Sequence, residues 1–287
     1  MELIALHTFR TVVEEGGILA ASRKLNTVQS NVTSRIRRLE EELGAELFFR
    51  KGRGLELAPS GRVLLDYARR MLLLERQTSA AVKQVGESAG ELRIGAMETF
   101  AALHLPKALK AVRATHPRVD LRVVTDTSAA LAERVLAHKL DCAFIAGPVV
   151  HPALQFELLV IEELVQICAI GANPVVQPLI LFREGCAYRA RALALAWQRA
   201  MGHAVADAME FGTLEGILGC VSVGLGWTLM PRRVVEQSPH AADLVIETLP
   251  DDIAQVPTGM IYLRDAPPMN VLNTLAEAVA AAARPKN

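Results

Sequence analysis

The chain has 287 residues, of which 51% are hydrophobic, and its 31 Lys and Arg balance its 31 Asp and Glu. This length supplies apolar side chains for two or three ordinary cores. No apolar run is long enough to span a bilayer, and the N-terminus lacks the basic-then-apolar pattern of a secretory signal. The four cysteines have no metal-ligand spacing. Composition therefore indicates a multidomain cytoplasmic protein with reduced thiols, without a metal or cofactor, and argues against a membrane or secreted protein.

The balanced net charge hides local clusters. Residues 1–88 hold 14 Lys and Arg against 11 Asp and Glu, and the remainder holds 17 against 20. Charges are screened beyond about 8–10 Å at physiological salt, so the basic groups at 35–38 and 50–53 matter more than either total.

The first predicted elements are helices. Leu3, Leu6, Phe9 and Val12 have amphipathic spacing, and residues 17–43 predict two further helices joined by a tight turn. Asn26 and Thr27 supply that polar turn and a cap for the helix that follows. The first two helices and the buried face of the third would form a small core around Phe9.

The third helix has two contrasting faces. Val32, Ile36, Leu39 and Leu43 recur at three- and four-residue spacing and form a buried stripe. Its other faces carry side chains that donate to base edges and phosphates, namely Gln29, Ser30, Thr33, Ser34, Arg35, Arg37 and Arg38. The alternative is an ordinary helical hairpin with a solvated charged face, which is the commoner meaning of this pattern in isolation.

The flanking sequence favours the DNA-binding interpretation. Residues 47–50 lead into the basic glycine turn 51–54, and residues 55–57 alternate as a strand does, which together predict a hairpin wing. Arg50, Lys51 and Arg53 would lie along the phosphate backbone and add affinity without sequence information.

At this point the sequence resembles the winged helix-turn-helix of LysR-type transcriptional regulators. The many fixed spacings within sixty residues make this a specific match, carried by Leu6, Phe9, Leu25, Gln29, Ser30, Val32, Ile36, Leu39, Glu40, Leu43, Gly44, Leu47, Phe48, Arg50, Leu57, Pro59 and Gly61. Two positions depart from the family pattern, Gly17 where serine is usual and Val28 where a small hydroxyl residue is frequent.

A long helix is predicted from about 61 to 86. Its apolar stripe, with no partner expected inside the N-terminal domain, predicts packing against the same helix of a second subunit, through Val63, Leu64, Tyr67, Met71, Leu74, Thr78 and Val82. The resemblance implies the same, a homodimer through this linker helix, and also a homotetramer. Two DNA half-sites would likewise require a dimer.

After a Gly-rich boundary at 86–90 the pattern changes to alternating strands and helices. Strands are predicted at 92–95, 119–124 and 141–145, with helices at 103–115 and 129–138, which is the order of a parallel, doubly wound sheet. The second half repeats this order, with crossovers near 147 and 255. The resemblance implies an effector domain built like a periplasmic binding protein, in which two α/β subdomains enclose a cleft.

The predicted domains are therefore a winged helix-turn-helix at 1–60, a linker helix at 61–88 and an effector domain at 89–287. Subdomain I would take about 89–147 and 256–287, and subdomain II about 148–255. The whole is an α/β chain with an N-terminal DNA-binding head.

Candidate ligand-binding residues follow from where the strands end. Ligands of such sheets collect at the carboxyl ends of strands, here residues 97–100, 125–128 and 146–149, with 182–186 and 212–213 across the cleft. Helix starts at these points favour an anion. The selected effector residues are Glu98, Thr99, Phe100, Thr127, Ser128, Gly147, Phe182, Arg183, Cys186, Gly212 and Thr213. For Ser128 and Thr213 a helix cap is the competing interpretation.

Other functions find less support. Cys186, between Arg183 and Arg189, could be a redox-sensing thiol, but no second cysteine lies nearby in sequence to resolve a sulfenic acid. No nucleophile elbow, phosphate-binding loop or histidine ligand set occurs, so an enzyme is not expected. The sequence predicts a LysR-type regulator that binds double-stranded promoter DNA and a small-molecule effector. The remaining alternative is a small-molecule receptor without DNA readout.

Overall fold

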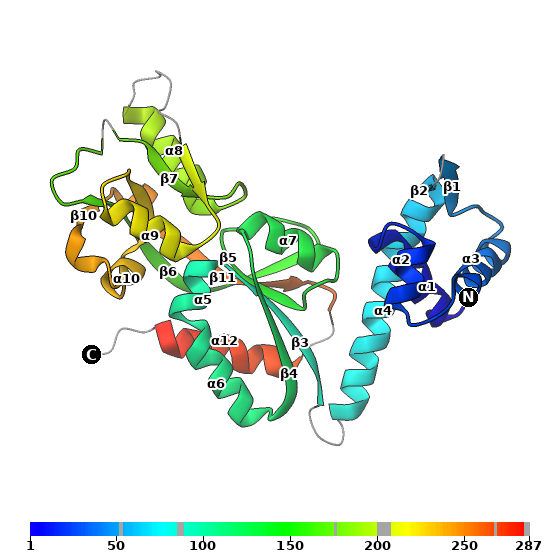
Figure 1. Ribbon diagram of the computed structural model, residues 1–287. Coiled ribbons are helices and arrows are strands. Elements are labelled where there is room, and N and C mark those ends of the chain that lie inside the picture. The colour runs from blue at the N-terminus through cyan, green and yellow to red at the C-terminus, as the bar shows by residue number, and fades with distance from the viewer. Residues whose placement is uncertain (52–53, 85–88, 175–176, 200–207, 267–268, 284–287) are drawn as a thin grey trace. The chain divides into compact units, whose positions relative to one another are not determined.

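The structure is a computed structural model that describes residues 1–51, 54–84, 89–174, 177–199, 208–266 and 269–283 (Figure 1). Contacts divide the chain into two compact units, an N-terminal unit, Met1–Glu87, and a C-terminal unit, Ser88–Asn287. Each unit has its own buried apolar clusters.

The N-terminal unit places three helices before a hairpin and a long helix. Its elements are α1 (Leu3–Glu14), α2 (Ile18–Lys24), α3 (Gln29–Leu43), β1 (Phe48–Lys51), β2 (Gly54–Leu57) and α4 (Pro59–Gln84). Phe9 is fully buried, and its ring lies 5.4 Å from that of Phe48. The helical stripe predicted for α3 is buried at Val32, Ile36 and Leu39, whereas Leu43 is exposed.

The end of α3 is tied to the start of the hairpin. Gly44 ends the helix in the left-handed conformation, with φ of +63°, which glycine adopts without strain. The Glu40 carboxylate then accepts hydrogen bonds from the backbone N–H groups of Leu47, at 2.8 Å, and Phe48, at 3.4 Å. One side chain of α3 thereby fixes where the β1–β2 hairpin begins.

The start of α3 differs from its prediction. The residue that caps α3 is Val28, which offers no side-chain hydrogen bond. The Thr27 hydroxyl instead accepts from the Asn31 amide at 3.1 Å. The predicted cap at 26–27 is therefore wrong.

The linker helix packs within its own unit, contrary to the prediction that it has no partner there. Leu64, Ala68 and Leu72 of α4 are buried in the same core as Phe9. Other members of the predicted stripe are exposed, namely Val63, Tyr67, Met71 and Leu74. The helix therefore has one face buried in its own unit and an apolar face turned to solvent.

The C-terminal unit alternates strands and helices through most of its length. Its elements are β3 (Ala89–Ala96), α5 (Glu98–Leu103), α6 (Leu105–Thr115), β4 (Arg118–Thr125), α7 (Ser128–Leu136), β5 (Cys142–Ala146), β6 (Leu154–Ala169), β7 (Leu179–Phe182), α8 (Ala187–Arg199), β8 (Ala208–Phe211), α9 (Leu214–Ser222), β9 (Thr228–Pro231), α10 (Arg232–Glu236), a 3-10 turn (Ala241–Asp243), β10 (Leu244–Thr248), α11 (Asp251–Ala254), β11 (Gln255–Leu263) and α12 (Asn270–Ala283).

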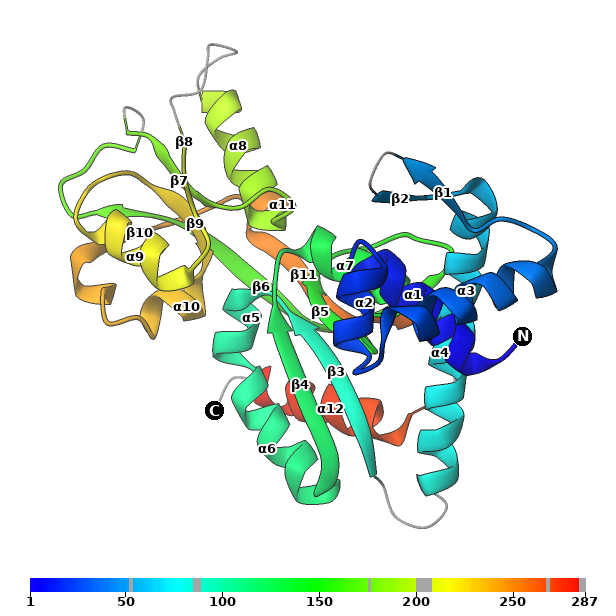
Figure 2. The same ribbon diagram turned by 45° about the vertical axis from the view of Figure 1, so that its right-hand side comes forward.

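The main sheet has the order β10-β6-β11-β5-β3-β4, and β9 also pairs with β6. Strand β3 runs parallel to β4 and β5, as the βαβ order predicts, but β11 and β6 join antiparallel. The helices α6 and α12 pack together on one face of this sheet, and α7 lies on the other (Figure 2). The sheet is therefore mixed where the sequence predicted parallel pairing.

The C-terminal unit has two lobes joined by long strands. We call β3, α5, α6, β4, α7, β5 and α12 the first lobe, and β7, α8, β8, α9, β9, α10 and β10 the second. β6 has 16 residues, which at about 3.3 Å per residue span roughly 50 Å, so it passes through both lobes. Beside it, β11 pairs with β6 from Leu154 to Glu163.

Several elements differ from their predicted limits. The helix expected at 103–115 is interrupted at His104, which separates α5 from α6. The sequence also predicts a strand from Val160 to Ile170, but β6 begins earlier, at Leu154. The stretch 232–254, for which no element is predicted, contains α10, β10 and α11.

Candidate functional site

The exposed face of α3 carries the side chains predicted to contact DNA. Across from its buried stripe, Gln29, Ser30, Thr33, Ser34, Arg37 and Arg38 are all exposed. The Thr33 hydroxyl donates to the Gln29 carbonyl at 2.9 Å, which satisfies it within the helix. These side chains thus lie together on one solvent-facing surface.

The three arginines of α3 differ in their surroundings. Arg37 pairs with Glu41 at 2.9 Å, and Arg38 pairs with Glu42 at 3.3 Å and with Glu2 at 3.5 Å, all on the surface. Exposed ion pairs of this kind contribute little to stability, so both guanidiniums can exchange a carboxylate for a phosphate. Arg35 is half-buried and donates to the Thr8 hydroxyl at 3.4 Å.

The hairpin has the register expected for a wing. Phe48 pairs with Leu57, and Lys51 with Gly54, in an antiparallel ladder. Arg50 and Lys51 lie on β1 by their backbones, and Arg53 falls outside the described residues.

The C-terminal unit contains a cavity between its lobes. Its volume is about 450 Å3, space open to solvent included, and it is lined by Met97, Glu98, Thr99, Thr125, Asp126, Thr127, Ser128, Phe182, Arg183, Cys186, Tyr188 and Gly212. The first-lobe residues follow the ends of β3 and β4, and the others follow the ends of β7 and β8. A cavity at the carboxyl ends of strands is where this topology places ligands.

Eight of the eleven residues predicted to bind the effector line this cavity, namely Glu98, Thr99, Thr127, Ser128, Phe182, Arg183, Cys186 and Gly212. Phe100 points into the core instead, where its ring stacks on Phe144 with centroids 4.7 Å apart. Gly147 donates its N–H to the Pro257 carbonyl at 2.7 Å, and Thr213 caps α9 by accepting from the N–H of Gly216.

Tyr188 also lines the cavity, although it is not among the residues predicted from the sequence. It lies in the first turn of α8, two residues after Cys186, and this position at a helix start facing the cleft is the signal that could have found it.

The two lobes touch at the cavity. The Asp126 carboxylate binds Arg134 of its own lobe at 2.8 Å and faces Arg183 of the other lobe at 3.6 Å. The N–H of Ala129 donates to the Gly185 carbonyl at 3.2 Å. Gly185 has φ of +87°, and a Cβ there would lie 2.8 Å from the Thr127 hydroxyl and 3.0 Å from the Ala129 methyl. Glycine at 185 therefore allows the lobes to approach this closely.

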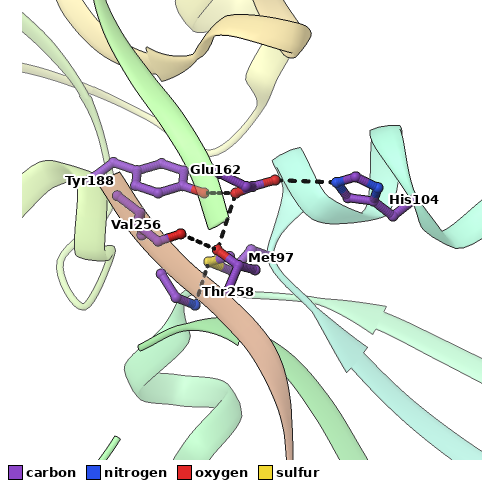
Figure 3. A network of polar contacts seen from close by, with 7 residues as sticks. Met97, His104, Glu162, Tyr188, Val256 and Thr258 are labelled. Atoms are coloured by element: carbon purple, nitrogen blue, oxygen red, sulfur yellow. Dashed lines mark hydrogen bonds and ion pairs between the residues drawn. The ribbon is translucent and has the colours of Figure 1, made fainter. Parts of the chain in front are cut away.

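A buried polar network, centred on Glu162 of β6 (Figure 3), adjoins the cavity through Tyr188. Its carboxylate accepts from the Tyr188 hydroxyl at 2.6 Å and from the Thr258 hydroxyl at 3.3 Å, and its other oxygen lies 3.4 Å from His104 Nε2. The side chains come from both lobes and from both long strands. A buried carboxylate with these partners therefore joins the two lobes and the two long strands next to the cavity.

Burial determines the ionisation of the neutral lining groups. It raises the pKa of the Cys186 thiol, although the N–H groups of Arg189 and Tyr188 oppose the shift. Burial, reinforced by the nearby Glu162 charge, raises the pKa of Tyr188 well above its ordinary value. Both groups are therefore protonated at neutral pH, and Cys186 lacks the low pKa of a reactive thiol.

None of the helices in the described ranges combines the length and apolarity needed to cross a membrane.

Comparison with known proteins gives a consistent result for both units. The model of the bacterial regulatory helix-turn-helix protein, lysR family, matches residues 3–62, and the LysR substrate binding domain matches residues 86–284. The chain is 38% identical to the HTH-type transcriptional regulator YusT of Bacillus subtilis over 93% of this chain and 91% of that protein. It is 37% identical to SoxR, an HTH-type transcriptional regulator of an Arthrobacter species, over 97% and 96%.

Solved structures share the fold. A full-length OxyR variant from Pseudomonas aeruginosa matches with a TM-score of 0.71 at 19% identity, covering 97% of this chain and 94% of that one. CbnR in complex with its target DNA matches with a TM-score of 0.66 at 23% identity, covering 98% and 100%. The two family matches and the similarity to named regulators over nearly the whole length show that this chain belongs to the LysR family of bacterial transcriptional regulators.

Proposed function

We propose that the chain binds promoter DNA sequence-specifically through α3 and changes that binding when a small effector occupies the cavity of the C-terminal unit. The observation that carries the DNA part is the division of α3 into a buried apolar face and an exposed polar and cationic face. An α-helix with this layout fits the major groove, where Gln29 and Arg38 would meet base edges or phosphates. The solved complex of CbnR with its target DNA has the same fold.

The experiment is a salt titration of DNA affinity by fluorescence anisotropy, with operator fragments selected from genomic DNA by the purified protein. We expect Gln29→Ala to weaken operator binding by about 1–3 kcal/mol while leaving random duplex unchanged. Arg35→Ala and Arg38→Ala should also weaken operator binding. Arg53→Ala in the wing should weaken all DNA alike and lower the salt slope by about one.

The matched control is Arg122→Ala. Arg122 has 66% of its side chain exposed, against 68% for Arg38, and also pairs with a surface carboxylate, but it lies in the C-terminal unit. Unchanged operator affinity in all the N-terminal variants, or no salt dependence in the wild type, would favour a receptor without DNA readout.

The effector part of the proposal rests on the cavity and its contacts from both lobes. A ligand that contacts both lobes stabilises one arrangement of the lobes relative to another. Such a difference in free energy is required if effector binding is to alter DNA binding. The structure of LysG from Corynebacterium glutamicum with its effector Arg bound has the same fold, with a TM-score of 0.64 at 20% identity.

The exposed stripe of α4 supports assembly into a homodimer. Val63, Tyr67, Met71 and Leu74 are 38–61% exposed and recur at three- and four-residue spacing, although the neighbouring face of α4 is buried in its own unit. An exposed apolar stripe on a helix is buried by pairing with another helix. We propose a homodimer through this face and a homotetramer of such dimers, acting in the cytoplasm where promoter DNA lies.

Sedimentation velocity tests this assembly. Leu74→Glu should dissociate the dimer with unchanged helix content, because Leu74 is 59% exposed in its own unit. Asp66→Asn, on the same helix at a polar exposed position, is the control. A Leu74→Glu protein that sediments as the wild type would place the dimer interface elsewhere.

A redox function for Cys186 is the second candidate, favoured only by its position in the cavity beside Arg183. Its raised pKa argues against it.

A further inference from the structure

The cavity is lined by ionisable groups of both signs. Glu98 and Asp126 contribute two carboxylates and Arg183 one guanidinium, while Arg134, which binds Asp126, contributes a second positive charge beside the lining. Cys186 and Tyr188 are neutral. The formal charges around the cavity therefore cancel, which fits a ligand that carries no net charge better than a dianion.

Arg183 can exchange its ion-pair partner more readily than the other charged residues of the cavity. Its side chain is 56% exposed, and its guanidinium lies 3.6 Å from the Asp126 carboxylate, beyond a good hydrogen bond. Asp126, by contrast, is held by Arg134 at 2.8 Å and by the N–H of Thr127 at 2.9 Å. A ligand carboxylate can replace Asp126 as the partner of Arg183, because the existing pair is long and solvated.

A second observation points to a ligand at the same place. The Thr99 side chain is 1% exposed and lines the cavity, and its hydroxyl has no hydrogen-bond partner at bonding distance among the described residues. It lies near the Tyr188 hydroxyl, whose proton is donated to Glu162 and whose oxygen can still accept from Thr99. Because this contact does not reach hydrogen-bond geometry, an oxygen of a ligand in the cavity would be a better acceptor for the buried Thr99 hydroxyl.

We propose that the effector is a small zwitterion with an amino group and a carboxylate, such as a free amino acid. Its carboxylate would bind Arg183 and the Thr99 hydroxyl, and its ammonium group would bind Asp126 and Glu98. This inference rests on the proposed effector function of the cavity. A dicarboxylate is selected against, because one of its charges must face Glu98 or Asp126.

The test is a thermal-shift screen of the full-length protein followed by calorimetric titration. The probes are the twenty proteinogenic L-amino acids, the α-hydroxy acid that replaces each amino group by a hydroxyl, the corresponding decarboxylated amines, and succinate as a dicarboxylate. We expect one or a few amino acids to bind, and the matching hydroxy acid and amine to bind at least tenfold more weakly. Operator affinity of the same samples should change with the bound amino acid only.

Variants of the lining residues test where the ammonium group and the carboxylate of the ligand bind. Asp126→Asn and Glu98→Gln should each weaken the amino acid at least tenfold while weakening its hydroxy acid much less, and Thr99→Val should weaken both. Asp120→Asn, an exposed aspartate on β4 outside the cavity, should bind as the wild type. Asp126→Asn also weakens the ion pair with Arg134, so its effect on binding could be indirect. Glu98→Gln therefore tests the ammonium site independently.

Three outcomes overturn the proposal. If succinate or a hydroxy acid binds as tightly as the amino acid, the ligand is an anion and the zwitterion inference fails while the effector function stands. If both carboxylate variants bind the amino acid normally, the ammonium site is misplaced. If no probe binds or alters operator affinity, the zwitterion inference fails. The DNA-binding function is tested independently, by the operator affinity of the protein without ligand.

Discussion

Replacing Tyr188 by phenylalanine removes the shortest contact to the buried carboxylate of Glu162. The Glu162 side chain is about 4% exposed, and its partners are Tyr188 at 2.6 Å, Thr258 at 3.3 Å and His104 at 3.4 Å. A hydrogen bond to a charged group contributes about 1.5–3 kcal/mol, and the two remaining contacts are too long to replace it. We expect Tyr188→Phe to lower the free energy of unfolding by about 2 kcal/mol.

Tryptophan fluorescence measures this loss, because both tryptophans, Trp197 and Trp227, belong to the C-terminal unit. For a unit of this size, about 2 kcal/mol corresponds to a fall in Tm of roughly 4–8 °C. Tyr262→Phe, half-buried on β11 and outside the Glu162 network, should change stability by less than about 0.5 kcal/mol. A Tyr188→Phe protein as stable as the Tyr262→Phe control would refute the assigned role of the network.

Three further changes test the N-terminal core, the wing junction and the cysteine. Ile36→Ala should destabilise the N-terminal unit by about 2–5 kcal/mol in a circular dichroism melt, since Ile36 is 7% exposed, whereas Thr33→Ala at an exposed position of the same helix should leave the melt within about 0.5 kcal/mol. Gly61→Ala should lower the Tm of that unit, because a Cβ there would collide with the Leu47 carbonyl; an unchanged melt would show that the hairpin can shift away. The raised pKa of Cys186 keeps the thiol protonated, so its alkylation by iodoacetamide should be slower than that of a free cysteine at pH 7 and should accelerate only at a higher pH than the alkylation of a free cysteine does. Mass spectrometry follows the modified peptide, and rapid reaction at pH 7 would restore the redox interpretation.

Local periodicity accounts for most of what the sequence predicted. The stripe Val32, Ile36 and Leu39 is a property of one helix, so the exposed polar face of α3 could be deduced without tertiary information. The position of Arg35 could not, because its half-burial depends on how α1 packs beside α3 and brings Thr8 within 3.4 Å. The same limit applies to α4, whose burial at Leu64 and Leu72 depends on its packing against the N-terminal core.

The positions of the cavity residues could likewise be predicted only in part from the sequence. Strand ends at 97, 125 and 182 indicated where ligands collect, and Thr99 and Arg183 were found there. Phe100 adjoins Thr99 in sequence, yet its ring stacks on Phe144, since successive helical residues point about 100° apart. β11 pairs antiparallel with β5, and β10 pairs antiparallel with β6. These pairings join segments that are distant in sequence, so short-range patterns do not predict them.

The antiparallel strand β11 also sets the order in which the chain can be completed during synthesis. β5, whose five residues are all buried, lies between β3 and β11, and β11 leaves the ribosome more than a hundred residues after β5. Until then one edge of β5 is an open template for pairing with another chain. A chain that ends before residue 255 would leave this edge open and be prone to aggregation, so truncation shortly before that residue should be as damaging as truncation soon after β5.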